Sequence, residues 1–144
     1  MKLSSPFLAL LTIVAFPLHT LADFHIFNCD HCYGVGDQSG CDAPVIAVPS
    51  NQYSCSGLRN NPVIYDLDGH GGENSDFSIP NLCGVAQINA YPRSSSLIEL
   101  YINNGNGQVV GSCYPGGHGK LTCPAAFDQL ACSDDWVCYT YICS

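Results

Sequence analysis

Short apolar segments, rich in β-branched and aromatic residues, recur along the chain between clusters of turn-forming residues. These segments cover residues 24–29, 44–48, 62–67, 85–91, 96–102, 108–114 and 136–143. Segments of this length, separated by turn signals, are typical of antiparallel β proteins. The pattern therefore predicts a mainly β fold, a small antiparallel β-sandwich or barrel.

Two local features refine this prediction. Residues 96–102 and 108–114 flank 103-NNGNG-107, whose asparagines and glycines tolerate the positive φ angles of a hairpin loop, so we expect a hairpin here. Residues 124–131 begin with Pro124 and contain alanine, glutamine and leucine, which are good helix formers. The sequence thus predicts one short helix, with Cys123 and Cys132 at its ends.

The first 22 residues have the pattern of a secretory signal peptide. Lys2 precedes an apolar run over residues 6–18, and small residues surround the expected cleavage site after Ala22. The run is short for a membrane span and contains Pro17. We therefore expect residues 1–22 to be removed and residues 23–144 to form a single extracellular domain, monomeric and without a membrane partner.

All ten cysteines lie in the expected mature chain, which is about 8 % cysteine. An even number of cysteines in a small exported chain predicts a disulfide-stapled domain with five bridges. The pairing cannot be deduced from the sequence. The cysteines are Cys29, Cys32, Cys41, Cys55, Cys83, Cys113, Cys123, Cys132, Cys138 and Cys143.

The C-x-x-C formed by Cys29 and Cys32 allows two other interpretations. With His31 inside it and His25 nearby, it has the donor types of a zinc site, but zinc requires reduced thiolates. A redox motif requires a βαβ context and a helix terminus that stabilises the thiolate, and the charge of Asp30 opposes a thiolate. We favour structural disulfides, with His31 an exposed loop residue, and we expect neither a metal nor a cofactor.

The mature chain is strongly acidic. Its three basic residues, Arg59, Arg93 and Lys120, stand against twelve acidic ones, which leaves a net charge of −9. A field of this sign repels nucleic acids and anionic membranes, and it opposes a cationic antimicrobial action. We therefore expect a partner that is neither a nucleic acid nor a membrane.

The segment 66–76 is the most polar and glycine-rich part of the chain, and we regard it as a possible functional loop. Its charged and titratable residues are Asp66, Asp68, His70, Glu73 and Asp76. The spacing resembles the first half of an EF-hand loop, but the twelfth position is Phe77 instead of a bidentate glutamate. A weak calcium site stays an alternative to a solvated acidic loop.

Acid–base catalysis would have to use a scattered set of residues. The candidates are His70, Glu73, His118 and Lys120, with Arg59 or Arg93 as an electrophile. Nothing in the sequence places them within hydrogen-bond reach of one another, which catalysis requires first, and no G-x-S-x-G motif is present. We expect no catalytic residues.

The C-terminal segment is unusually aromatic, with Trp136, Tyr139 and Tyr141. Aromatic residues in strands mostly pack in or beside a core. A stacking surface for a sugar or a protein is the alternative interpretation.

The signal pattern, the acidic mature chain, the motifs 27-FNC-29 and 49-PSNQYSC-55 and the ten cysteines together resemble the small secreted cysteine-rich proteins of filamentous fungi. Many of those proteins are candidate effectors, so the resemblance implies a role in virulence through binding a host or competitor protein or glycan, without catalysis. The first motif is also similar to ribonuclease-like effectors, and residues 98–111 resemble a hairpin of the small guanyl-specific fungal ribonucleases. The position of that family's catalytic histidine falls in 112-SCYPGG-117. This departure implies that even a ribonuclease-like chain would be catalytically inactive.

Overall fold

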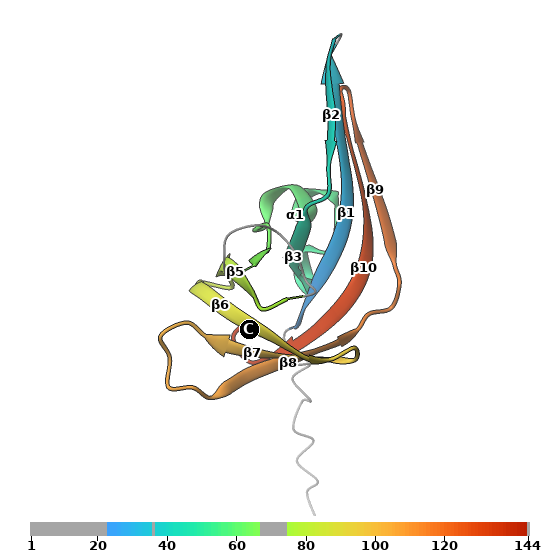
Figure 1. Cartoon of the computed structure of the whole chain (residues 1–144). Helices are drawn as coiled ribbons and strands as arrows, with labels where there is room; N and C mark the ends of the chain where they lie inside the picture. Colours follow the sequence, from blue (N-terminus) through green and yellow to red (C-terminus); the bar gives the residue numbers. More distant parts are fainter. Residues whose placement is uncertain (1–22, 36, 67–74, 144) are drawn as a thin grey trace, which may run out of the picture.

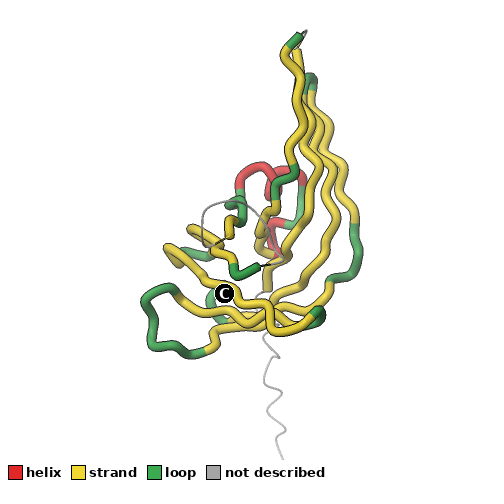
Figure 2. Tube along the Cα trace, viewed as in Figure 1, coloured by secondary structure: helices red, strands yellow, loops and turns green. Residues whose placement is uncertain are grey.

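The computed structural model describes residues 23–35, 37–66 and 75–143, which form one curled antiparallel sheet with two short helical segments (Figures 1 and 2). The strands are β1 (Asp23–Val35), β2 (Gln38–Asp42), β3 (Val45–Pro49), β4 (Tyr65–Asp66), β5 (Phe77–Leu82), β6 (Val85–Ser94), β7 (Leu97–Ile102), β8 (Val109–Pro115), β9 (Lys120–Ala125) and β10 (Asp128–Thr140). The helical segments are the 3-10 turn η1 (Ser50–Gln52) and α1 (Cys55–Asn60). The expected signal peptide and most of the 66–76 loop lie outside the described residues.

The longest strands, β1 and β10, pair with each other at the centre of the sheet. The other edge of β1 is shared by β3 and β2, and the other edge of β10 is shared by β8 and β9. The sheet therefore divides into two parts. In one part β2, β1, β10 and β9 extend away from the rest of the protein as a four-stranded projection, which we call the arm (residues 29–42 and 120–133; Figure 1).

In the other part, β8, β7, β6, β5 and β4 follow one another in antiparallel order and curl into a half-barrel (Figure 1). An isolated bridge between Ile46 of β3 and Val63, just before β4, connects the β4 end of this curl to β3. The N–H of Ala47 donates to the carbonyl of Pro62 at 3.1 Å, which strengthens the same connection. The predicted sandwich or barrel is thus a half-barrel, and the mainly β fold class is confirmed.

Two apolar clusters hold these parts together. The larger cluster fills the half-barrel, with Phe24, Phe77 and Leu100 fully buried. The smaller one, which includes Phe27 and Leu58, lies where α1 packs on the inner side of the arm. The close approach of α1 to η1 requires Gly57, because a Cβ there would lie 1.8 Å from the carbonyl oxygen of Gln52.

The expected five disulfides are confirmed, and none of the ten cysteines is free. The pairs are Cys29–Cys132, Cys32–Cys41, Cys55–Cys123, Cys83–Cys143 and Cys113–Cys138. The two cysteines of the C-x-x-C motif therefore bond to different partners. Three of the bridges join residues that face each other in adjacent strands: Cys29–Cys132, Cys32–Cys41 and Cys113–Cys138.

The predicted hairpin is confirmed, since β7 pairs with β8 and the positive φ angles fall on Asn104 and Gly107. The predicted helix over residues 124–131 is wrong, because this segment forms the turn and flanking strands of the β9–β10 hairpin. Leu121 and Cys123 in β9, and Leu130 and Cys132 in β10, occupy every second position of their strands, so these apolar side chains share one face and pack against α1. Their burial outweighs the local preference for a helix. The one short α-helix lies instead at residues 55–60, where Ser54 accepts a capping hydrogen bond at 3.1 Å from the N–H of Gly57.

The position of each bridge predicts the order in which reductant breaks it. Thiol–disulfide exchange requires the attacking thiolate to reach a sulfur atom. Cys32 and Cys41 are exposed in the arm, whereas Cys113 and Cys138 are fully buried. With limiting reductant followed by alkylation, peptide mass spectrometry should find label first on Cys32 and Cys41 and last on Cys113 and Cys138. The reverse order would contradict the arrangement described here.

Candidate functional site

The tip of the arm presents two large aromatic side chains to solvent. Phe127, in the β9–β10 turn, is 65 % exposed, and Tyr33, near the end of β1, is 50 % exposed. The N–H of Gly34 donates to the carbonyl of Phe127 at 3.0 Å, so the two hairpins are joined at their ends. The aromatic tip therefore belongs to one surface made by both hairpins.

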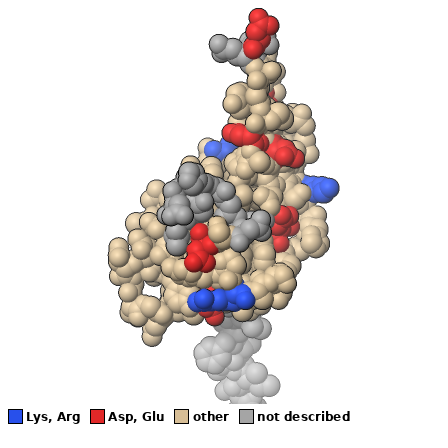
Figure 3. All heavy atoms as spheres, viewed as in Figure 1, with Lys and Arg blue, Asp and Glu red and all other residues tan. Residues whose placement is uncertain are grey.

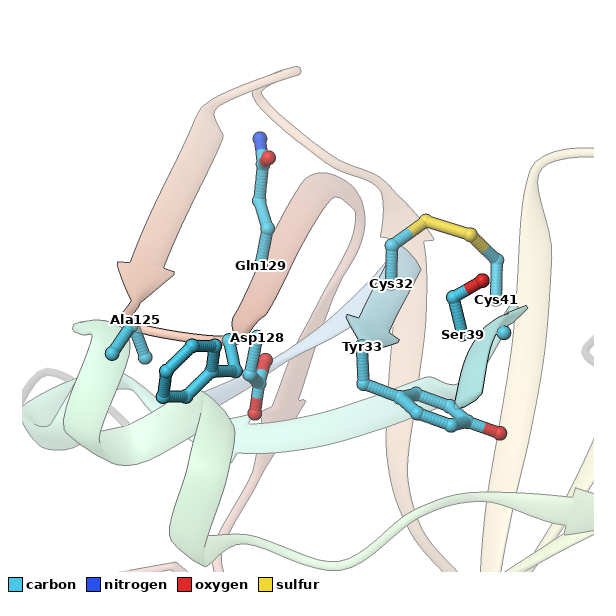
Figure 4. A pocket seen from close by; sticks show the side chains of 10 residues that line it. Cys32, Tyr33, Ser39, Cys41, Ala125, Asp128 and Gln129 are labelled. Carbon is cyan, nitrogen blue, oxygen red and sulfur yellow. A yellow bond between two sulfur atoms is a disulfide. The ribbon is translucent and has the colours of Figure 1, made fainter. Parts of the chain in front are cut away.

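An open pocket of about 430 Å³ lies between the two hairpins at this tip. Figure 4 shows the Cys32–Cys41 bridge and the Tyr33 ring on one side and Asp128 and Gln129 on the other. The backbone of Gly40 lies against the Tyr33 ring, because a Cβ at that position would be 3.0 Å from the tyrosine hydroxyl. The pocket is thus lined by an aromatic ring, a disulfide and polar side chains.

His31 ties three strands together beneath this pocket. Its Nδ1 lies 2.9 Å from Oδ1 of Asp42 in β2, and its Nε2 lies 3.1 Å from Oδ1 of Asp128 in β10. Each ring nitrogen therefore faces a carboxylate from a different neighbouring strand. The expectation that His31 is an exposed loop residue is wrong, because strand pairing places it, half-buried, between two carboxylates.

Arg59 connects α1 to the same cluster. Its Nη1 donates to Oδ2 of Asp128 at 2.9 Å, and its Nη2 donates to the carbonyl of Cys123 at 2.8 Å. The hydrogen bond from Arg59, and secondarily the one from His31, lowers the pKa of the Asp128 carboxyl below its usual range. Beside this cluster lies a pocket of about 290 Å³ with Ile46, Leu58 and Leu130 among its lining residues.

A second histidine cluster lies where the arm joins the half-barrel. Asp134 is 4 % exposed, and its Oδ2 accepts hydrogen bonds from Nδ1 of His25 at 2.9 Å and from the hydroxyl of Tyr53 at 3.3 Å. Burial, and after it the nearby Asp134 charge, raises the pKa of Tyr53. All three groups are turned inward, and the cluster joins β1, β10 and the segment before α1.

Among the residues that the structure describes, the sequence-predicted catalytic candidates are not brought together. Asp68, His70 and Glu73 lie outside the described residues, Asp66 ends β4, and Asp76 is exposed beside β5. Within the described part, neither His118 nor Lys120 forms a hydrogen bond or ion pair with Arg59 or Arg93. Arg93 pairs instead with Glu99, at 2.7 Å. His118 is exposed in the β8–β9 connection with a positive φ of 56°.

The aromatic C-terminal segment divides between two faces. Trp136 packs against the core of the half-barrel, whereas Tyr139 and Tyr141 are 47 % and 61 % exposed. Among the described residues there is no group of three or more histidine, cysteine or acidic side chains that could hold a metal ion. In the same part of the chain, no helix has the length and apolar character to cross a membrane.

Comparisons of this chain with protein-family models, with curated proteins and with solved structures found no significant match. The site is therefore described by its own geometry. Sequence reasoning missed the exposed Phe127 because it assigned that residue to a helix. The alternating pattern on both sides of residues 126 and 127 was the available signal for a hairpin turn.

The lowered pKa of Asp128 predicts how stability depends on pH. A carboxyl group whose pKa is lower in the folded state adds stability above its unfolded pKa, and this stability is lost as the pH falls through the folded pKa. The melting temperature of an Asp128→Asn variant should therefore be lower than that of the native protein at pH 6, by a few degrees at most, because solvent screens this partly exposed ion pair. The difference should shrink as the pH falls from about 4 toward 3.

Thermal unfolding followed by circular dichroism across this pH range measures the effect. The matched control is Asp37→Asn, which removes the same charge from an exposed turn residue of the arm and should change the melting temperature little. A difference for Asp128→Asn that stays constant down to pH 3 would contradict the role given to its ion pair.

Proposed function

We propose that this chain is an exported, effector-like protein that acts outside the cell by binding a protein of a host or competitor, without catalysis. The signal-peptide pattern of residues 1–22 supports export, and the five bridges suit an oxidising environment. The observation that carries the proposal is the arm, which projects from the half-barrel and ends in exposed aromatic side chains.

The arm has the properties of a rigid binding element. Cys32–Cys41 closes its outer hairpin, Cys29–Cys132 joins its central strands, and Arg59 fastens its inner side to α1. A surface that is already ordered loses little conformational entropy on binding, which improves affinity. Phe127 and Tyr33 would act as anchors, because large aromatic side chains that become buried at the centre of an interface contribute much of the binding energy.

The charge of the arm indicates the charge of its partner. Residues 29–42 and 120–133 contain four aspartates, Asp30, Asp37, Asp42 and Asp128, and a single basic residue, Lys120. Arg59 of α1 compensates Asp128, so the other three aspartates leave the arm an excess of negative charge. Figure 3 shows acidic side chains at the end of the arm and where it meets the body. The partner is therefore a basic protein, and the narrow shape of the arm suits a concave site on it, because complementary charge steers association.

A hydrolase is the second candidate, because His31, Arg59, Asp42 and Asp128 converge beside one pocket. A general base needs a free nitrogen that can reach the substrate. Both nitrogens of His31 already face carboxylates, and both Nη atoms of Arg59 donate a hydrogen bond within the protein. We therefore assign this cluster to holding the arm in place.

The arm proposal predicts a specific loss of binding. Oxidised mature protein, immobilised on beads, should capture a basic protein from the extracellular fluid of a host or competitor, and raised salt should weaken the capture. A Tyr33→Ala, Phe127→Ala variant should bind at least about tenfold more weakly.

The matched control is Tyr65→Ala, which removes a tyrosine that is 43 % exposed away from the arm and should leave capture unchanged. The affinity of the captured protein is then measured by surface plasmon resonance. Equal affinities for the arm variant and the native protein would exclude the arm as the binding element.

The assignment of the His31 cluster predicts no cleavage of RNA. The net charge of −9 of the expected mature chain repels a polyanion. Among the described residues, His31 faces two carboxylates and His118 is exposed. Fluorescence-quenched single-stranded RNA should be cleaved no faster by the native protein than by a His31→Ala, His70→Ala, His118→Ala variant between pH 4 and 8. Faster cleavage with a bell-shaped pH profile would favour the hydrolase.

A further inference from the structure

The outer face of the half-barrel carries a row of side chains that strand register places together. Tyr91 in β6 faces Glu99 in β7, Glu99 faces Ser112 in β8, and Ser112 faces Tyr139 in β10. Directly opposed residues of an antiparallel sheet lie on the same face. Their neighbours Ala90 and Leu100 are fully buried, so this row points outward.

Three more tyrosines extend the row: Tyr101, Tyr114 and Tyr141. The rings of Tyr91 and Tyr101 are 5.4 Å apart between centroids, and those of Tyr114 and Tyr139 are 6.2 Å apart. We call this surface the tyrosine face (Tyr91, Tyr101, Tyr114, Tyr139 and Tyr141). On its β8–β10 side, a shallow groove of about 480 Å³ is lined by Tyr114, Tyr139, Tyr141 and Ser112.

The tyrosine face is electrically neutral although the protein is strongly acidic. The strand segments that form it, residues 89–93, 97–101, 109–114 and 137–141, contain only two charged residues, Arg93 and Glu99. Nε of Arg93 donates to Oε2 of Glu99 at 2.7 Å, and the hydroxyl of Tyr101 donates to the same oxygen at 2.9 Å. The guanidinium of Arg93 also lies over the Tyr91 ring, 5.6 Å from its centroid. The two charges thus compensate each other.

The side chains of this face match a ligand that is apolar on its faces and polar at its edges. Each tyrosine offers a flat apolar ring and a hydroxyl, and Tyr114, Tyr139 and Tyr141 are each about half-exposed. A sugar ring has the complementary pattern, because its C–H groups can stack on an aromatic ring while its hydroxyls form hydrogen bonds. Val109 is the one exposed aliphatic residue that lines the groove, and every exposed ring there belongs to a tyrosine, so each stacking surface carries a hydroxyl at its edge.

We propose that the tyrosine face is a second binding site, separate from the arm, that binds a neutral polysaccharide across β7, β8 and β10. Neutrality is part of the proposal, because the net charge of −9 of the expected mature chain repels an anionic polymer, while the compensated Arg93–Glu99 pair offers no free charge to a cationic one. Repeating sugar units would contact successive tyrosines, so the binding energy is shared among several weak stacking contacts.

Co-sedimentation with insoluble cellulose, chitin and β-1,3-glucan tests the proposal. The oxidised mature protein should sediment with at least one of them. Binding to a carboxymethylated form of the same polymer should be weaker, because the added charge is negative. A Tyr139→Ala, Tyr141→Ala variant should bind about tenfold more weakly, as expected for the loss of two stacked rings.

Two controls make the result specific to this face. The arm variant Tyr33→Ala, Phe127→Ala should bind the polysaccharide as well as the native protein, so this test can fail without affecting the arm proposal. Unchanged melting temperatures would show that the variants are folded. The proposal is overturned if no neutral polysaccharide retains the protein, if the Tyr139→Ala, Tyr141→Ala variant binds normally, or if a protein captured through this face excludes the sugar.

Discussion

The antiparallel ladder between β1 and β10 supports every other part of the structure. It runs from the pair Asp23–Tyr139 to the pair Tyr33–Asp128, so the two strands reach from the half-barrel to the tip of the arm. The other edge of β1 pairs with β3 and then with β2, and the other edge of β10 pairs with β9 and then with β8. A single sheet therefore forms both a half-barrel and an arm. The Cys29–Cys132 bridge links the two strands of this ladder covalently, across a sequence separation of 103 residues. A cross-link over a loop of that length raises the free energy of the unfolded chain by roughly 4 to 5 kcal/mol, because it removes conformational entropy.

The ladder is irregular where the partners change. The register shifts so that Ile26 faces Trp136 while Phe27 faces Asp134, which leaves Asp135 as the extra residue of a β-bulge. The bulge accompanies the inward position of the Asp134 carboxylate, whose Oδ2 accepts hydrogen bonds from His25 and Tyr53 while its buried Oδ1 has no hydrogen-bond partner in the described part of the chain. The β8–β9 connection can approach this cluster because Gly119 has no side chain, since a Cβ there would lie 2.4 Å from the Tyr53 hydroxyl.

The candidate sites were predictable only in part. The exposed Tyr139 and Tyr141 belong to a segment whose aromatic character suggested a stacking surface, but nothing local indicated that Tyr91 and Tyr101 lie on the same face. That juxtaposition depends on strand order and register, which involve residues far apart in the chain. The His31 cluster was missed for the same reason, because Asp128 is 97 residues away from His31 and was assigned to a helix.

By itself the sequence determined the strand-rich character of the chain, the β7–β8 hairpin and the participation of every cysteine in a bridge. Alternating apolar residues, turn residues and an even cysteine count are local properties, so they can be interpreted without knowing the fold. Only the tertiary structure decided which cysteines pair, that residues 120–133 form a hairpin, and where the exposed aromatic side chains gather. These features depend on the β1–β10 register, because a shift of one residue would turn every side chain of the shifted strand to the opposite face.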